Sequence, residues 1–211
     1  MATASTTSTG MFDNPLFSDI KIRQTRDGVT KEYHAHKAVL CAVSPWFLGL
    51  FTGIQDVDIG VATMPGDDPQ DFEAMLRYIY TQELKHPGLD RNVYWDGAEM
   101  KINYLLDIHA IADKYEVRGL QACASEHFPL VHELEEHEFD VYFLELIVET
   151  HYRTCIDNRC SMGRRICGYI LKREPDFIKT GRVGHPLLKA WPKFTQDLLE
   201  EALENNGGRL C

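Results

Sequence analysis

The residues best suited to chemistry are a histidine and three cysteines late in the chain: His151, Cys155, Cys160 and Cys167. Imidazole and thiolate groups are preferred zinc ligands, but the intervals of four, five and seven positions do not match the usual zinc knuckle. Because Cys160, Cys167 and Leu171 recur at a heptad-like interval, the pattern favours a buried helix face. We therefore expect neither a metal nor a cofactor in this protein.

Two other groups of residues resemble a catalytic or metal site, and both have a simpler structural interpretation. His34 and His36 lie two positions apart, on one face of a strand, but the sequence offers no obvious further ligands. Ser44 lies near Cys41, yet no G-x-S-x-G elbow surrounds it, and the proline that follows makes it a helix N-cap. No phosphate-binding glycine loop occurs either, so we expect no enzyme activity.

Composition restricts the partners that we expect. The chain has 211 residues, a formal net charge of -10, and scattered basic residues that acidic residues outnumber 32 to 22, so direct nucleic-acid binding is not expected. No apolar run reaches the roughly 18 residues of a membrane span. The polar start MATASTTSTG lacks the features of a signal peptide, and the six cysteines form no CxxC pair. We therefore expect reduced thiols and a cytoplasmic or nuclear location.

Alternating hydrophobicity predicts a β-hairpin in the first part of the chain. Residues 19–23 alternate with the period of a strand, and 29–35 form the expected return strand. Asp27 and Gly28 between them are a strong hairpin-turn signal. A third short strand is expected at 56–59.

Helices are expected over most of the remaining chain. Within YHAHKAVLCAVSPWFLGLF (33–51), an apolar turn of helix precedes Ser44-Pro45, a typical helix start, and Gly53 ends the second helix in the manner of a C′ glycine. Asp68 caps the next helix, which ends near Thr81. A long loop spans 84–101. Further helices are expected at 104–117, 120–128, 139–150, 160–173 and 194–203.

Four stretches, in order, resemble the BTB/POZ family: FSDIKIR (17–23), YHAHKAVLCAVSPWFLGLF (33–51), FEAMLRYIYTQEL (72–84) and LLDIHAIADKYEVRGLQACASEHF (105–128). The resemblance implies an α+β class with the BTB/POZ fold, a small mixed sheet flanked by helices, and here an α-helical C-terminal extension. It also implies a non-catalytic module for protein–protein interaction. The expected divisions are a disordered tail (1–15), the BTB/POZ domain (16–130), the helical extension (131–205) and a second tail (206–211).

Within this family, many members are substrate adaptors of cullin-based ubiquitin ligases, and others recruit co-repressors. Asp19 and Lys37 match a charged groove of repressor-type members, or else form a structural ion pair that fixes the first strand to the helical hairpin. Ile54-Gln55-Asp56 is the nearest candidate for the apolar-x-Glu motif of cullin-binding members, with Asp in place of Glu. The residues expected to bind protein partners are Asp19, Lys37, Phe51, Ile54, Gln55, Asp56, Tyr80, Tyr94, Trp95 and Tyr142.

Several departures from the family pattern shape the functional expectation. Only 18 residues precede Asp19, so we expect the strand and helix that swap across some family dimers to be absent or reduced. No Kelch or zinc-finger domain follows, a layout similar to small stand-alone fungal members, so a client would be held by the 84–101 loop, the C-terminal helices or a second protein.

The resemblance favours an adaptor that links a partner to a cullin scaffold. The alternative is a homodimeric scaffold or transcription-regulatory protein that acts without cullin. Two other interpretations stay open. One is a metal-sensing or enzymatic role of the 151–167 cluster, and the other is a degenerate relative that binds only through the 84–101 loop and the C-terminal helices.

Overall fold

The computed structural model describes the segments 10–53, 60–85, 89, 97–128, 141–155, 160–173 and 186–205. The chain forms two compact units. The first comprises Met1–His86 with Lys114–Leu120, and the second comprises Pro87–Asp113 with Gln121–Cys211. A small mixed sheet with flanking helices and a helical C-terminal part confirms the expected α+β class. The expected divisions at 15, 130 and 205 stay predictions.

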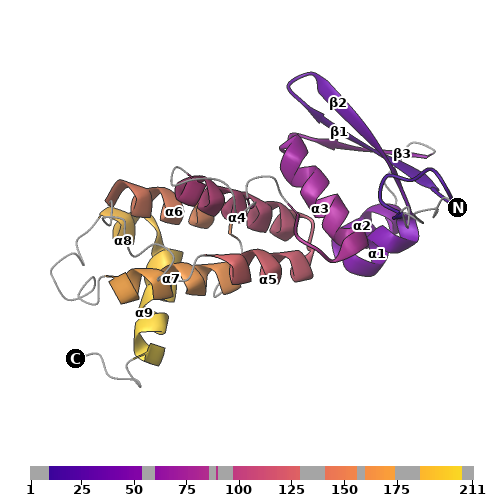
Figure 1. Cartoon of the computed structure of the whole chain (residues 1–211). Coiled ribbons are helices and arrows are strands. Elements are labelled where there is room, and N and C mark those ends of the chain that lie inside the picture. Colours follow the sequence, from indigo (N-terminus) through magenta and orange to yellow (C-terminus); the bar gives the residue numbers. More distant parts are fainter. Residues whose placement is uncertain are drawn as a thin grey trace, which may run out of the picture. The chain divides into compact units, whose positions relative to one another are not determined.

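The first unit contains a three-stranded sheet in the order β2-β1-β3, drawn in indigo and purple in Figure 1. Strands β1 (Ile20–Arg26) and β2 (Val29–Ala35) are antiparallel, whereas β3 (Val61–Pro65) runs parallel to β1. Asp27 and Gly28 have φ of 51° and 79°, the two positive values that a tight hairpin turn requires. The hairpin is confirmed. The third strand that we expected at 56–59 lies outside the described residues.

Two helices of the first unit begin at the caps that the sequence indicates. Helix α1 (Lys37–Val43) leads into α2 (Pro45–Thr52), and Ser44 Oγ accepts the Phe47 N–H at 3.1 Å to cap α2. Asp68 caps α3 (Pro69–Thr81) in the same way. Gly53 does end α2, but with an extended backbone (φ -73°) instead of the left-handed conformation typical of a C′ glycine.

Aromatic side chains form the centre of the first unit. Phe47 stacks on Tyr115 with centroids 5.6 Å apart, and Phe72 meets the same Tyr115 ring edge-on at 5.6 Å. Tyr33 from the sheet lies 6.2 Å from Phe72. All four rings are almost completely buried, so this cluster joins β2, α2 and α3 to the 114–120 segment. It thereby gives the helical hairpin a rigid support.

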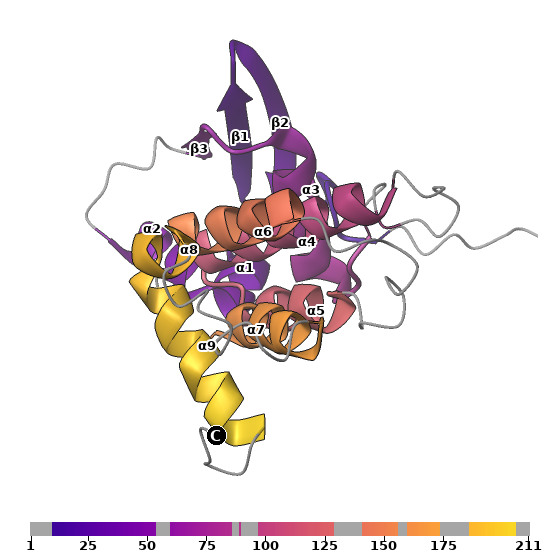
Figure 2. The same cartoon turned by 90° about the vertical axis from the view of Figure 1, so that its left-hand side faces the viewer.

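The described part of the second unit is helical, as Figure 2 shows for the α4–α9 region. Its elements are α4 (Gly97–Lys114), α5 (Arg118–His127), α6 (Val141–Thr154), α7 (Ser161–Arg173), α8 (Pro186–Ala190) and α9 (Pro192–Asn205). Helix α4 begins inside the expected 84–101 loop and ends before Val117, so that loop is shorter than predicted. Helix α8 was not predicted.

The buried apolar face of α6 comprises Leu144, Ile147, Val148 and Tyr152. Leu146 is 44% exposed, and Phe143 is half-buried. Across the described segments, no helix combines the length and the apolar character that crossing a membrane requires.

Candidate protein-interaction surface

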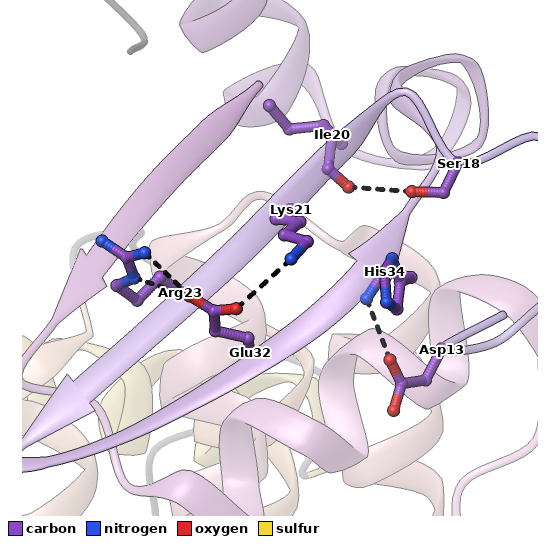
Figure 3. Close-up of polar contacts among 7 residues, drawn as sticks. All are labelled: Asp13, Ser18, Ile20, Lys21, Arg23, Glu32 and His34. Atoms are coloured by element: carbon purple, nitrogen blue, oxygen red, sulfur yellow. Dashed lines mark hydrogen bonds and ion pairs between the residues drawn. The ribbon is translucent and has the colours of Figure 1, made fainter. Parts of the chain in front are cut away.

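The segment that precedes β1 is attached to the first unit by its polar and aromatic side chains. Asp13 Oδ1 accepts the His34 N–H at 2.9 Å, a contact drawn in Figure 3. The Phe12 ring lies 6.0 Å from the Tyr80 ring and beneath the Arg77 guanidinium at 4.3 Å. These contacts fix residues 10–19 against β2 and α3 without a strand or helix in that segment.

Two apolar side chains of this segment point to solvent. Leu16 is 61% exposed and Phe17 is 82% exposed. Phe17 also has φ of 61°, in the left-handed region that aromatic residues rarely adopt. Backbone strain of this kind is concentrated at functional sites, so Phe17 is a candidate contact for a partner. The Leu16-Phe17 pair was not among the expected site residues, although its position directly before the first strand was a signal.

His36 connects this segment to α3. Its Nε2 lies 2.8 Å from the carbonyl oxygen of Leu16, which can only accept, so Nε2 carries the proton. In the neutral ring, Nδ1 is then left to accept from the Tyr80 hydroxyl at 3.1 Å. The hydroxyl oxygen in turn accepts the His36 backbone N–H at 2.9 Å. Both ring nitrogens of His36 therefore have partners within the chain, as the structural interpretation of this histidine predicts.

Tyr80 packs against His36. Burial raises the pKa of its hydroxyl, although the hydrogen bond from the His36 N–H opposes that rise. Its half-buried ring meets the His36 ring edge-on, with centroids 5.8 Å apart. These contacts hold His36 in place, and the expected role of Tyr80 in partner binding stays a prediction.

Asp19 and Lys37 are neighbours, as the family resemblance implied. The contact runs through the backbone: Asp19 Oδ1 accepts the Lys37 N–H at 2.8 Å. It caps α1, where His36 at the N-cap position makes no side-chain cap bond. This bond fixes the start of β1 to the helical hairpin. It links the same elements as the expected ion pair, but through the backbone N–H of Lys37 instead of its ammonium group. The exposed Asp19 carboxylate stays accessible to a partner.

The aromatic ring of Phe51 also lies near Lys37. The Lys37 ammonium is 5.5 Å from the Phe51 ring centroid, within cation–π range. Phe51 stacks on the buried Phe47 at 5.9 Å and is itself half-buried. One turn earlier on α2, Leu48 is 47% exposed. Helix α2 thus carries apolar surface up to its C-terminal end.

The surface of strands β1 and β2 is polar, and its charged side chains pair with one another (Figure 3). Arg23 donates two hydrogen bonds to Glu32 at 2.8 and 3.0 Å, and Lys21 lies 3.6 Å from the same carboxylate. The Arg23 hydrogen bond lowers the pKa of Glu32. Ser18 donates to the Ile20 carbonyl at 3.3 Å. Exposed pairs of this kind contribute little stability, but they leave less apolar surface for a partner.

Asp19 and Phe51 both contact Lys37 at the start of α1, and Tyr80 contacts the neighbouring His36. Tyr142 belongs to α6, and its side chain is not described. The other five expected contact residues lie outside the described residues: Ile54, Gln55, Asp56, Tyr94 and Trp95. The roles of all ten residues in partner binding stay predictions.

Comparison with known proteins identifies the family. The sequence model of the BTB/POZ domain matches residues 9–129, more than half of the chain. The chain belongs to the BTB/POZ family. It is therefore built on a protein-interaction fold that is generally non-enzymatic.

Several curated BTB/POZ proteins are similar to part of this chain. Mouse TD and POZ domain-containing protein 5 is 30% identical over 117 residues, which are 55% of this chain and 30% of that protein. Human BTB/POZ domain-containing protein 3 is 35% identical over 74 residues, which are 35% of this chain and 14% of that protein. The match therefore spans at most 30% of the length of these relatives, and the layout similar to fungal members stays a prediction.

Proposed function

We propose that this BTB/POZ chain is an adaptor that links a partner protein to a cullin-based ubiquitin ligase. The observation that carries the proposal is the apolar surface of α2, which runs through the exposed Leu48 and the half-buried Phe51 to the end of the helix. Directly after that end comes Ile54-Gln55-Asp56, our candidate for the cullin-contacting motif. An exposed apolar helix face that continues into such a motif is suited to a protein partner.

The helical C-terminal part supports the same function. It follows the BTB/POZ region at the position where adaptor members carry helices that widen the cullin contact. We place Tyr142 of α6 on this cullin-binding face. We assign client binding to Tyr94 and Trp95, because aromatic side chains are enriched at interface hot spots. Adaptors of this class act in the cytoplasm and the nucleus, where we place this protein.

The test is direct binding between the purified chain and the N-terminal region of the cullin that binds BTB proteins, measured by biolayer interferometry. Ile54→Arg should abolish binding, because it places a charge in an apolar contact. Val29→Arg makes the same chemical change at a residue of the hairpin that is 66% exposed, and should leave binding intact. Undiminished binding by Ile54→Arg would overturn the motif assignment, and no binding by the wild-type chain would overturn the adaptor function.

A second function, a scaffold that self-associates without cullin, is favoured by the exposed Leu16-Phe17 pair ahead of β1. Such a pair would be covered in a homodimer. Phe17→Asn tests this, because asparagine tolerates the left-handed backbone while the apolar ring is removed. Light scattering should then show a wild-type dimer and a monomeric variant. A wild-type monomer contradicts the scaffold function.

A further inference from the structure

Three potential metal ligands meet in the second unit. His151 and Cys155 lie four positions apart at the end of α6, and Cys160 immediately precedes α7. His151 Nε2 is 3.2 Å from Cys160 Sγ, and Cys155 Sγ is 3.4 Å from it. All three ligand atoms lie within 4.8 Å of one another. Ligand atoms around a tetrahedral zinc are separated by about 3.3–3.8 Å, so this cluster is close to a zinc geometry before any ion is bound.

A fourth nitrogen lies beside them on α4. The ring of His109 is 5.3 Å from that of His151, and its residue is only 3% exposed. His109 Nε2 is buried and has no hydrogen-bond partner in the described part of the chain. A buried nitrogen without a partner costs about 1–3 kcal/mol, so such groups call for an explanation. His109 lies outside the group of three whose ligand atoms all fall within 4.8 Å of one another, so its ring would shift toward a bound ion to give this nitrogen a partner.

Hydrogen bonds hold the Cys160 sulfur at the centre of the cluster. The thiol of Cys155 donates to Cys160 Sγ at 3.4 Å. The Gly163 N–H donates to the same sulfur at 3.3 Å. Cys160 Sγ therefore already accepts two hydrogen bonds at the position where it would bind a cation.

Two other cysteines, Cys167 and Cys123, show how thiols outside the proposed ligand set are placed. Cys167 is fully buried, and its Sγ lies 3.7 Å from the Tyr152 hydroxyl. It does not belong to the group of three whose ligand atoms lie within 4.8 Å of one another, so we place it outside the ligand set. Cys123 lies 3.7 Å from His127 Nδ1 on α5, also four positions apart, and offers a Cys–His pair outside that set. It provides a control of the same chemistry.

We propose that His109, His151, Cys155 and Cys160 form a closed Cys2His2 zinc site that joins α4, α6 and the start of α7. Four protein ligands leave no open position, so the site is structural rather than catalytic. The spacing in the sequence argued against it because its ligands come from three separate elements. The site does not depend on the adaptor function, and either can fail without the other.

The test uses the full chain without an affinity tag, purified under reducing conditions without chelators. Elemental analysis should find about one zinc per chain. After zinc removal, titration with Co²⁺ should give the strong ligand-field absorption of tetrahedral cobalt, together with thiolate-to-cobalt charge transfer. Absence of zinc together with no tetrahedral cobalt spectrum overturns the proposal. So does a Cys155–Cys160 disulfide detected by mass spectrometry in the same reduced preparation.

Variants distinguish the four ligands from their surroundings. Cys160→Ser and His109→Phe should lose zinc, whereas Cys123→Ser should keep it. Cys160→His should still bind cobalt, with charge-transfer intensity reduced by about half because one of two thiolates is gone. This variant keeps the test valid if Cys160→Ser fails to fold. Zinc retained by His109→Phe would remove His109 from the site, and equal loss in Cys123→Ser would show a nonspecific effect.

Discussion

Ser44→Ala tests whether one hydroxyl holds the helical hairpin of the first unit in place. Ser44 is fully buried, and its Oγ accepts the Phe47 N–H at 3.1 Å while donating to the Tyr115 carbonyl at 2.6 Å. Loss of the N-cap costs about 1 kcal/mol. Loss of the donor to a buried carbonyl costs about 1–3 kcal/mol more. The free energy of unfolding should therefore fall by about 2–4 kcal/mol.

Urea unfolding followed by the fluorescence of Trp46 measures this loss. The Trp46 ring lies 5.1 Å from Phe47 and 4.7 Å from Tyr115, so it reports on the same contact. Trp95→Phe and Trp191→Phe in the background remove the other two tryptophan signals. The midpoint should fall while the slope m is unchanged.

Ser18→Ala is the matched control, because Ser18 makes a single 3.3 Å bond in a partly buried place. It should cost about 0.5 kcal/mol. If Ser44→Ala costs no more than Ser18→Ala, the reasoning is wrong.

Three further predictions concern other contacts. Burial alone would raise the pKa of Glu73, but hydrogen bonds from Lys31 and Arg77 outweigh it and lower that pKa. The ionised Glu73 therefore stabilises the fold above the usual pKa of 4.5, and this stabilisation is lost as the pH falls through the folded pKa. In urea unfolding, the difference in free energy of unfolding between the wild type and Glu73→Gln should shrink below about pH 4.5. Tyr80→Phe removes both hydroxyl contacts with His36 and should lower the free energy of unfolding by about 1–3 kcal/mol in the same assay, and no change would contradict the supporting role. Gly163→Ala places a Cβ 2.9 Å from both Asp197 Oδ2 and the Tyr152 hydroxyl. It should therefore destabilise the second unit by about 1–3 kcal/mol in unfolding followed by Trp191 fluorescence. A stabilised variant would show that these two side chains can move to make room.

Local signals in the sequence were sufficient for the hairpin and the helix starts. Asp27-Gly28 specifies a turn with two positive φ values, and Ser44-Pro45 specifies a capped helix, because each acts through contacts only a few residues away. Strand β3 was missed because its five residues, VATMP, are stabilised by parallel pairing with a distant strand. Helix α8 is equally short, and helices of that length depend on their tertiary contacts.

Prediction of the site was limited in the same way. The resemblance placed Asp19 beside Lys37, but only the structure gives the backbone N–H as the atom that is bound. The metal-like cluster was discounted because spacing rules describe ligands on one local motif. His109 lies 42 positions before His151 in the sequence, so no periodicity relates the two. The Asp19–Lys37 bond and the metal-like cluster both depend on contacts between elements that are distant in the sequence. Such contacts are the part of a fold that is hardest to predict from a single sequence.

The most direct test of the adaptor function is the binding of the purified chain to the N-terminal region of the BTB-binding cullin. The proposal predicts binding by the wild-type chain and by Val29→Arg, and loss of binding by Ile54→Arg. A wild-type chain that shows no binding, while circular dichroism shows it to be folded and light scattering shows it to be free of aggregates, would contradict it.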